Sequence, residues 1–219
     1  MQDLSHLLRQ QTVFIFDFDG VLADSVEIKT EAFAALFQSY GDDVMQKVVA
    51  YHRQHGGVNR YDKLRYYYAE YLGHELSEQE LAKQAQNFSQ LVVDKVVAAP
   101  EIAGANDFLN TYSSQKKCFI NSATPHVELL EILKRRGWLN HFEGVFGAPA
   151  SKSENLQQIF ADYNVNPDVC LFFGDSDSDL AAAQSVGIPF VGVNLLPVFS
   201  PAQLNEVSCR IDSFQAITG

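Results

Sequence analysis

The sequence predicts an α/β protein with an all-helical insertion, and three observations support this. Short, wholly apolar runs are typical of strands buried on both faces of a parallel sheet. Helical patterns separate these runs, which is the order found in a doubly wound sheet. Residues 24–97 carry helical spacings and no convincing strand. We therefore expect a doubly wound parallel (Rossmann-like) core of residues 1–23 and 98–219, with residues 24–97 as a helical cap domain.

The predicted strands are four short apolar runs, Val13–Phe16, 118–120, 169–173 and 188–193. Clear start and stop signals mark a helix between the second and the third of them. Thr124 can cap its N-terminus, and Pro125 suits its first turn. The basic run 134–136, followed by Gly137, suits its end.

The cap segment has two apolar faces at helical spacing. One carries Leu64, Tyr67, Tyr68, Tyr71 and Leu72, and the other carries Leu81, Ala85, Phe88 and Val92. About seventy residues of helix are too many for a crossover between neighbouring strands. We therefore interpret the segment as an inserted domain, with hinges near residues 23–27 and 98–104 and a loop at Gly56-Gly57.

Composition and charge exclude several classes of protein. A formal net charge of −11 argues against nonspecific binding of nucleic acid, which needs basic stripes. No apolar run approaches membrane-spanning length, and the first residues lack the layout of a signal peptide. Cys118 and Cys170 lie in apolar runs, as expected of core residues in a reducing compartment. We expect a cytoplasmic protein that binds neither nucleic acid nor membrane; the sequence does not indicate its oligomeric state.

Polar side chains follow the predicted strands, at the edge of a parallel sheet where ligands bind. They are Asp17 and Asp19 after the first strand, Ser122 after the second, Lys152 ahead of a helix, and Asp175, Asp177 and Asp179 after the third. Clustered carboxylates are costly to bury unless a cation or hydrogen bonds compensate them. Because oxygen ligands suit Mg²⁺, the sequence predicts a magnesium site here.

Four segments in this order resemble the motifs of the haloacid dehalogenase (HAD) superfamily. They are "DFDGVLADS" from Asp17, the serine of "CFINSATP", the lysine of "GAPASKSENLQQIF" and the "GDSDSD" loop from Gly174. The resemblance covers nearly the whole chain. The helical insert is similar to the cap of the phosphoglycolate phosphatase and β-phosphoglucomutase-like branch. The resemblance implies a Mg²⁺ cofactor and phosphoryl transfer through an aspartyl phosphate.

The resemblance also implies roles for single residues. Asp17 would be the nucleophile, and Asp19 would protonate the leaving alcohol and then activate water. The other implied roles are Mg²⁺ ligation by Asp17, the Asp19 carbonyl, Asp175 and Asp179, and phosphoryl binding by Ser122 and Lys152. Elementary chemistry agrees, since residues i and i+2 of an extended chain face the same side. A carboxylate that attacks a phosphate dianion also needs cations to offset the repulsion.

Two of these residues have local alternatives. Ser151 and Glu154 have capping-box spacing, which would place Lys152 in a first helical turn, where a cation is mildly unfavourable without a nearby anion. Thr124 competes with Ser122 for the hydroxyl role. We favour Ser122, because Thr124 is already expected to cap a helix.

The cap segment 51–68 is basic within an acidic chain. Its cations Arg53, Arg60, Lys63 and Arg65 face one acid in the segment, Asp62. We interpret it as a specificity loop that closes over the site and meets an anionic substrate, with His55, Arg60 and Lys63 as candidate substrate-binding residues. A solvated helix face with Arg–carboxylate pairs is the alternative.

Together these features predict a Mg²⁺-dependent phosphatase that hydrolyses a small phosphorylated metabolite. A phosphosugar mutase would use the same two carboxylates. A phosphonatase would need a Schiff-base lysine in the cap, and Lys29, Lys47 and Lys63 are available. Dehalogenase chemistry is disfavoured because it attacks carbon and has no use for Asp19. The complete set of catalytic side chains argues against a non-catalytic phosphate-binding module.

Overall fold

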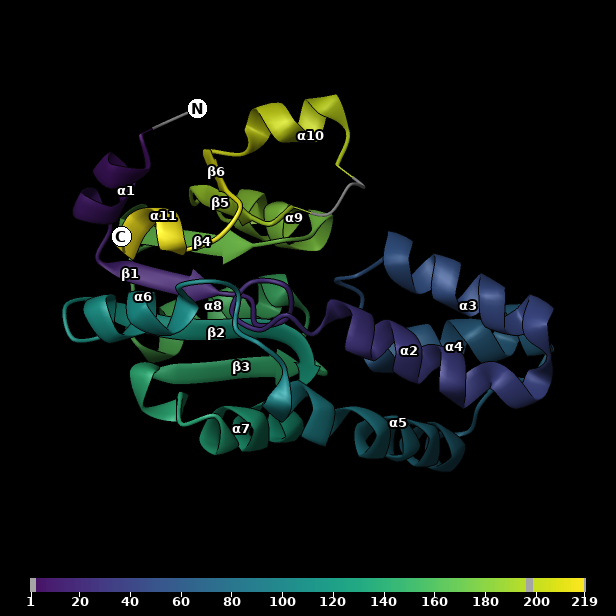
Figure 1. Cartoon of the computed structure of the whole chain (residues 1–219). Coiled ribbons are helices and arrows are strands. Elements are labelled where there is room, and N and C mark those ends of the chain that lie inside the picture. Colours follow the sequence, from purple (N-terminus) through teal and green to yellow (C-terminus); the bar gives the residue numbers. More distant parts are fainter. Residues whose placement is uncertain (1–2, 196–198, 219) are drawn as a thin grey trace.

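The computed structural model describes residues 3–195 and 199–218, and its core is a parallel sheet between two layers of helices (Figure 1). The sheet has six strands in the order β3-β2-β1-β4-β5-β6. They are β1 (Val13–Phe16), β2 (Lys117–Pro125), β3 (Gly144–Ala148), β4 (Cys170–Gly174), β5 (Phe190–Val193) and β6 (Cys209–Ile211), and all of their pairings are parallel. The predicted fold class is confirmed.

Helices flank this sheet and form the cap beside it. Those that flank it are α1 (Leu4–Gln10), α6 (Ala105–Tyr112), α7 (His126–Arg135), α8 (Lys152–Asp162), α9 (Asp177–Ser185), α10 (Pro201–Glu206) and α11 (Gln215–Thr218), with short 3₁₀ turns at Leu139–His141 and Pro167–Val169. Those of the cap are α2 (Val26–Phe37), α3 (Asp42–Gln54), α4 (Arg60–Tyr66) and α5 (Glu78–Ala98), with a 3₁₀ turn at Gln38–Tyr40 and a π-helical turn at Tyr67–Tyr71. Figure 1 shows α2 to α5 gathered into one body beside the sheet.

Strand β1 shows why both faces of the sheet are covered. All four of its side chains are buried. Phe14 and Phe16 belong to an apolar cluster with α6 and α7, whereas Val13 and Ile15 belong to a second cluster with α8 and α9. Because successive side chains of a strand point to opposite faces, one short apolar run supports two layers of helices.

All four predicted strands are present, and β3 and β6 are additional. Their short sequences, GVFGA and CRI, lack the continuous apolar run that marks a buried strand, which is why the pattern missed them. Both are edge strands of the sheet, which form backbone hydrogen bonds with one neighbouring strand only. Strand β2 is longer than expected and runs on to Pro125 with a register shift after Asn121.

The cap is helical throughout, as predicted. The apolar face of α5 is buried, and Leu64, Tyr67 and Tyr68 are buried on the facing side, whereas Tyr71 and Leu72 are partly exposed. The tyrosines that are buried act as core residues. Ser77 and Glu80 form a capping box that begins α5, which satisfies N–H groups at the helix start.

A buried ion pair joins the cap to the core. Arg60 of α4 donates two hydrogen bonds to Glu128 of α7, at 2.7 and 2.6 Å, and both side chains are almost fully buried. Ser89 of α5 donates a third hydrogen bond to Glu128, at 2.5 Å. This geometry is the strong bidentate form of an Arg–carboxylate contact.

We expect Glu128→Gln to lower the free energy of unfolding by about 3 kcal/mol, because it leaves the Arg60 cation buried without a counter-charge. The matched control is Glu131→Gln on the same helix, where the ion pair with Arg135 is exposed and the expected loss is below about 1 kcal/mol. Urea denaturation of the two variants measures the difference. Equal losses would show that the buried pair does not hold the cap.

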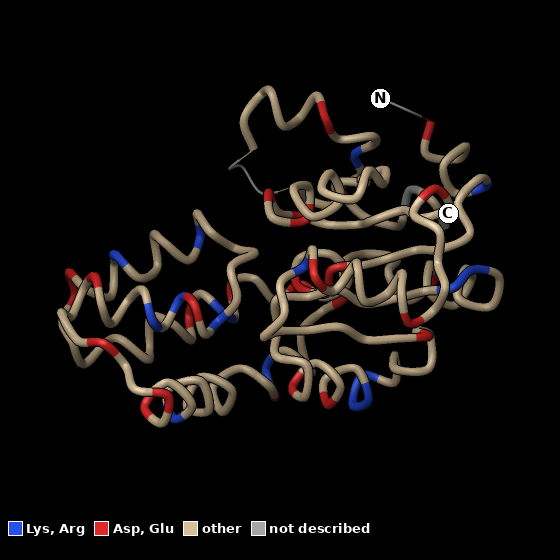
Figure 2. The backbone as a smooth tube through the Cα atoms, turned by 180° about the vertical axis from the view of Figure 1, so that it is seen from behind, with Lys and Arg blue, Asp and Glu red and all other residues tan. Residues whose placement is uncertain are grey.

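Charged residues of both signs are interspersed along cap and core (Figure 2). Within the part of the chain that the structure describes, every helix is too short or too polar to cross a bilayer. Cys118 and Cys170 are buried and unpaired, in agreement with their expected place in the core.

Candidate active site

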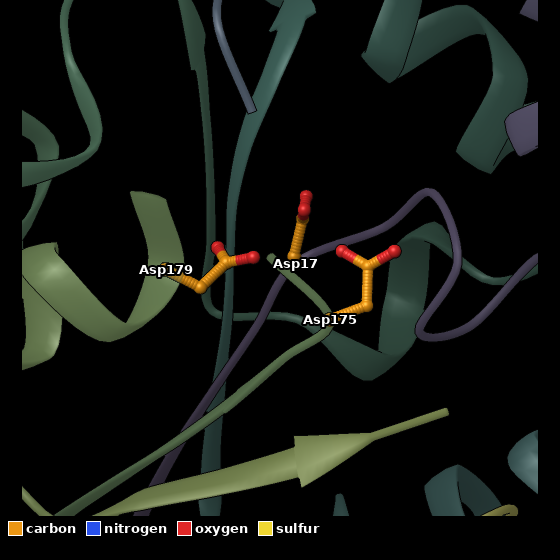
Figure 3. A group of neighbouring side chains, drawn as sticks. All are labelled: Asp17, Asp175 and Asp179. Carbon is orange, nitrogen blue, oxygen red and sulfur yellow. The ribbon is translucent and has the colours of Figure 1, made fainter. Parts of the chain in front are cut away.

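The carboxyl ends of β1 and β4, neighbours in the sheet, bring three of the predicted acids together (Figure 3). Asp17 directly follows β1, Asp175 directly follows β4, and Asp179 lies in the first turn of α9. One carboxylate oxygen of each lies within 4.8 Å of the others, and all three side chains are buried. Pairing of parallel strands thus joins two segments that are far apart in the sequence.

Lys152 reaches the same place from α8. Its Nζ donates to Asp17 at 2.7 Å and to Asp179 at 2.5 Å. The predicted capping box of Ser151 and Glu154 is present, so Lys152 is the first residue of α8. Burial disfavours its ammonium group, but the two carboxylates outweigh burial and raise the pKa of Lys152.

The three clustered acids fit a hard divalent cation. Burial, reinforced by Asp179 and Asp19 and opposed by Lys152, raises the pKa of Asp17 to about 6. Burial and the neighbouring carboxylates also raise the pKa of Asp175. When all three acids are ionised, the negative charges of the trio exceed the positive charge of Lys152 by two. A divalent ion would supply the missing charge, and the carboxylate oxygens suit Mg²⁺.

Gly20 leaves room for this cluster. Its φ of 79° lies in the left-handed region, and a Cβ atom there would lie 2.1 Å from a carboxylate oxygen of Asp175. A side chain at position 20 would therefore push into the acidic group, which explains the glycine in the loop after β1.

Asp19 lies beside the trio but makes its contacts with other residues. Lys29 of the cap helix α2 donates to its carboxylate, and Ser25 and Thr124 donate at 2.6 and 2.8 Å. Burial opposes the charged form, but Lys29 and the two hydroxyl groups outweigh it and lower the pKa of Asp19. The sequence reasoning weighed Lys29 solely as a Schiff-base candidate. The sequence did contain a signal for this contact. Lys29 is the one cation of α2, and it lies near the start of that helix.

The predicted helix cap at Thr124 is wrong. Pro125 occupies the N-cap position of α7, and no side chain caps this helix. Because β2 continues to Pro125, the Thr124 hydroxyl faces the site and donates to Asp19 instead. Ser122 accepts a hydrogen bond from the Thr124 N–H at 3.2 Å. Both hydroxyl groups therefore lie at the site, and the cap argument no longer favours Ser122 over Thr124.

Cap and core line a partly open cavity of about 60 Å³ over these residues. Its core side includes Asp17, Asp19, Ser122, Thr124 and Asp175, and its cap side includes Lys29, His52, Gly56, Gly57, Arg60 and Lys63. Two of the three cap candidates, Arg60 and Lys63, thus line it. The third, His55, lies outside the lining residues, with its ring against Tyr51 at 4.2 Å between centroids.

The cap loop contacts the core directly at Gly57. A Cβ atom at this position would lie 1.7 Å from the Ser178 hydroxyl oxygen and 2.9 Å from that of Ser176, at the start of α9. The predicted loop of Gly56-Gly57 therefore closes over the site, and glycine permits the close approach.

A family model described as haloacid dehalogenase-like hydrolase matches residues 14–193. The chain is 29% identical over 185 residues to a phosphorylated carbohydrates phosphatase of Thermotoga maritima, a match that covers 80% of this chain and 81% of that protein. It is 27% identical over 184 residues to a phosphoglycolate phosphatase of Synechococcus elongatus, which covers 82% of each.

Solved structures show the same fold. A β-phosphoglucomutase from Clostridium difficile superimposes with a TM-score of 0.75 at 22% identity, over 94% of this chain and 93% of that one. A predicted phosphoglycolate phosphatase from Haemophilus somnus gives a TM-score of 0.74 at 18% identity, over 95% and 96%. At these identities the similarity concerns the fold.

Proposed function

Since the chain belongs to the haloacid dehalogenase-like hydrolase family, whose curated relatives here are phosphatases, we propose that it is a Mg²⁺-dependent phosphatase that acts through an aspartyl phosphate on Asp17. The observation that carries the proposal is the buried group of Asp17, Asp175 and Asp179 around Lys152. The two relatives are named for phosphorylated carbohydrates and phosphoglycolate, which supports a small phosphorylated metabolite as substrate.

In this proposal Asp17, Asp175 and the backbone carbonyl of Asp19 would hold Mg²⁺. Asp179 supports the site, because both of its carboxylate oxygens already accept hydrogen bonds, from Lys152 and from Ser176. When bound, Mg²⁺ would offset the repulsion between the phosphoryl oxygens and the buried carboxylates.

The first chemical step forms a bond between an Asp17 oxygen and phosphorus. Lys152, within hydrogen-bond distance of Asp17, neutralises charge on the nucleophile and the phosphoryl group. The bond from phosphorus to the substrate oxygen breaks, and the leaving alkoxide takes from Asp19 a proton that Asp19 has first accepted from the acid form of the phosphate ester. Ser122 orients a phosphoryl oxygen, because the Thr124 hydroxyl group already donates to Asp19.

The second step uses Asp19 as a base. Lys29, Ser25 and Thr124 hold its carboxylate in the anionic form, the form that accepts a proton from water. The new oxygen–phosphorus bond replaces the bond to Asp17, which releases phosphate and restores the nucleophile. The cap covers Asp17 across the cavity, which restricts the access of bulk water while the first step proceeds.

The second candidate is a phosphosugar mutase, because the solved structure of a β-phosphoglucomutase has the same fold as this chain. The two functions differ in the fate of the phosphoryl group, which a mutase returns to a sugar. The names of both curated relatives favour hydrolysis.

A phosphate-release assay over a panel of phosphomonoesters, with p-nitrophenyl phosphate as the generic substrate, tests the proposal. Release of phosphate that depends on added Mg²⁺ is the expected result. Isomerisation of a sugar phosphate without net phosphate release would assign the mutase function instead.

Closure of the cap loop also leads to a prediction. Gly57→Ala should lower kcat/KM about tenfold, because the new methyl group collides with Ser178 and holds the loop away from the core. Since part of the collision is with the Ser178 side chain, Gly57→Ala combined with Ser178→Gly should recover most of the activity. Steady-state kinetics of the single and double variants measure this. Failure of the double variant to recover would mean that the loop contact does not govern closure.

A further inference from the structure

Three of the four cations that adjoin the cavity have a carboxylate partner. Lys152 pairs with Asp17 and Asp179, Lys29 pairs with Asp19, and Arg60 pairs with Glu128. The fourth is Lys63, and no carboxylate among residues 3–195 and 199–218 forms an ion pair with it. A buried cation without a counter-charge is costly, so this lysine calls for an explanation.

Lys63 is 2% exposed and has two neutral partners. Its Nζ lies 2.9 Å from Nδ1 of His52 and donates to the Gly56 carbonyl at 3.2 Å. An ammonium group can only donate, so Nδ1 of His52 accepts, and burial with the nearby lysines keeps the pKa of His52 well below its usual value. The Phe33 ring faces the ammonium group at 5.9 Å from its centroid, but no further oxygen or nitrogen of the described residues accepts a hydrogen bond from it, and Lys63 lines the cavity.

Arg60 leaves a second donor unused on the same helix face. Its two terminal nitrogens bind Glu128, but its buried Nε–H has no hydrogen-bond partner within the described residues. Arg60 and Lys63 are three residues apart in α4, a spacing that places them on one side of the helix, and both line the cavity. Two unsatisfied buried donors, one of them carrying net charge, thus lie at the cap end of the cavity.

We propose that Lys63 and the Nε–H of Arg60 bind a carboxylate of the substrate while its phosphoryl group lies at Asp17. The substrate class is then a short phosphorylated hydroxy acid. This inference rests on the proposed phosphatase function.

Charge and size select this class. A carboxylate supplies the negative charge that Lys63 lacks, whereas a sugar hydroxyl does not. The cavity of about 60 Å³ is much smaller than the ~150 Å³ that holds a benzene molecule. In this arrangement of cap and core, the cavity therefore suits a head group of few atoms.

The test uses two substrates that differ only in the end group, 2-phosphoglycolate and 2-hydroxyethyl phosphate. The wild-type protein should favour the carboxylate by about 10- to 100-fold in kcat/KM, as one desolvated charge-assisted contact provides. Lys63→Met should reduce this ratio to near one. The matched control is Lys47→Met on the cap surface, where an exposed lysine pairs with Asp43 and the ratio should stay at the wild-type value.

The ratio should also depend on pH. Burial, with Lys29 and Lys152 nearby and Asp19 in opposition, lowers the pKa of Lys63 to about 7. The other facing group, His52, is neutral in this range. The ammonium form therefore prevails below about pH 7 in the free enzyme, and the preference for the carboxylate should decline as the pH rises above it. In Lys63→Met the ratio should be independent of pH.

Stability offers a readout that needs no turnover. A lowered lysine pKa means that the folded state binds its proton less well than the unfolded state, which costs stability below the ordinary pKa of lysine. Lys63→Met should therefore melt at a higher temperature than the wild type at pH 7, and added 2-phosphoglycolate should raise the melting temperature of the wild type more than that of the variant.

The outcomes separate the two proposals. A wild-type protein that hydrolyses p-nitrophenyl phosphate but shows no preference within the substrate pair overturns this inference and leaves the phosphatase function in place. A protein that hydrolyses none of these esters overturns the proposed function. Borohydride trapping of an aldehyde-bearing phosphonate on Lys63 would also overturn the inference, because the amine would then act as a nucleophile.

Discussion

Asp17→Asn should lower kcat by at least ~10³-fold for every phosphomonoester that the wild-type protein hydrolyses. Asparagine has nearly the same size but lacks the anionic oxygen that would form the bond to phosphorus. Lys152 would also lose one of its two carboxylate partners, at 2.7 Å. Steady-state phosphate release by the purified variant, at saturating substrate and Mg²⁺, is the measurement.

Two controls keep this result specific. Asp24→Asn changes an exposed acid in the same motif and should leave kcat within about twofold. In EDTA, Asp17→Asn should melt no lower than the wild type, since a buried neutral amide costs less than a buried carboxylate. Wild-type turnover by the folded variant would remove Asp17 from the role of nucleophile and with it the proposed mechanism.

Removal of divalent metal should have an equally large effect. EDTA should abolish turnover, and excess Mg²⁺ should restore it, because the carboxylates of Asp17, Asp175 and Asp179 repel an incoming phosphate in the absence of a cation. The same ion should stabilise the fold. At about 100 times its dissociation constant, a ligand adds ~2.7 kcal/mol, which corresponds to a rise of about 5–10 °C in Tm for a chain of this size.

The matched variants for this experiment lie two residues apart, between the end of β4 and the start of α9. Asp175→Asn should lose most of the Mg²⁺-dependent rise in Tm, whereas Asp177→Asn, outside the acidic trio, should keep it. Differential scanning fluorimetry with and without Mg²⁺ measures both. Equal shifts in the two variants would place the ion elsewhere, and no shift in the wild type would argue against the metal site.

Much of the core could be predicted because its signals are local. Strand β1 is a run of four apolar residues followed by Asp17. Its first and last residues are those that the sequence pattern predicted. The capping box of Ser151 and Glu154 placed Lys152 at the start of α8 for the same reason, since a cap depends on residues within one turn. The glycine pair of the cap loop also lay where the pattern predicted.

Local reasoning failed where a side chain chose a distant partner. Thr124 is of a residue type that often caps helices, but it lies within β2. Its hydroxyl group donates instead to Asp19, 105 residues away in the sequence. Arg60 had the appearance of a free specificity residue, yet its terminal nitrogens pair with Glu128, 68 residues away. Spacing within one segment contains no information about such contacts.

The sequence alone determined where the acidic residues gather, since apolar periodicity sets the strands and the acids follow the strands at one edge of the sheet. The tertiary structure alone decided how charges are paired across cap and core, which, among the described residues, leaves Lys63 as the cation beside the cavity that has no carboxylate partner. The physical reason is the distance along the chain over which each kind of interaction acts. Strand and helix patterns arise from neighbours along the chain, whereas the ionisation and function of a buried charge depend on whichever groups the fold brings beside it.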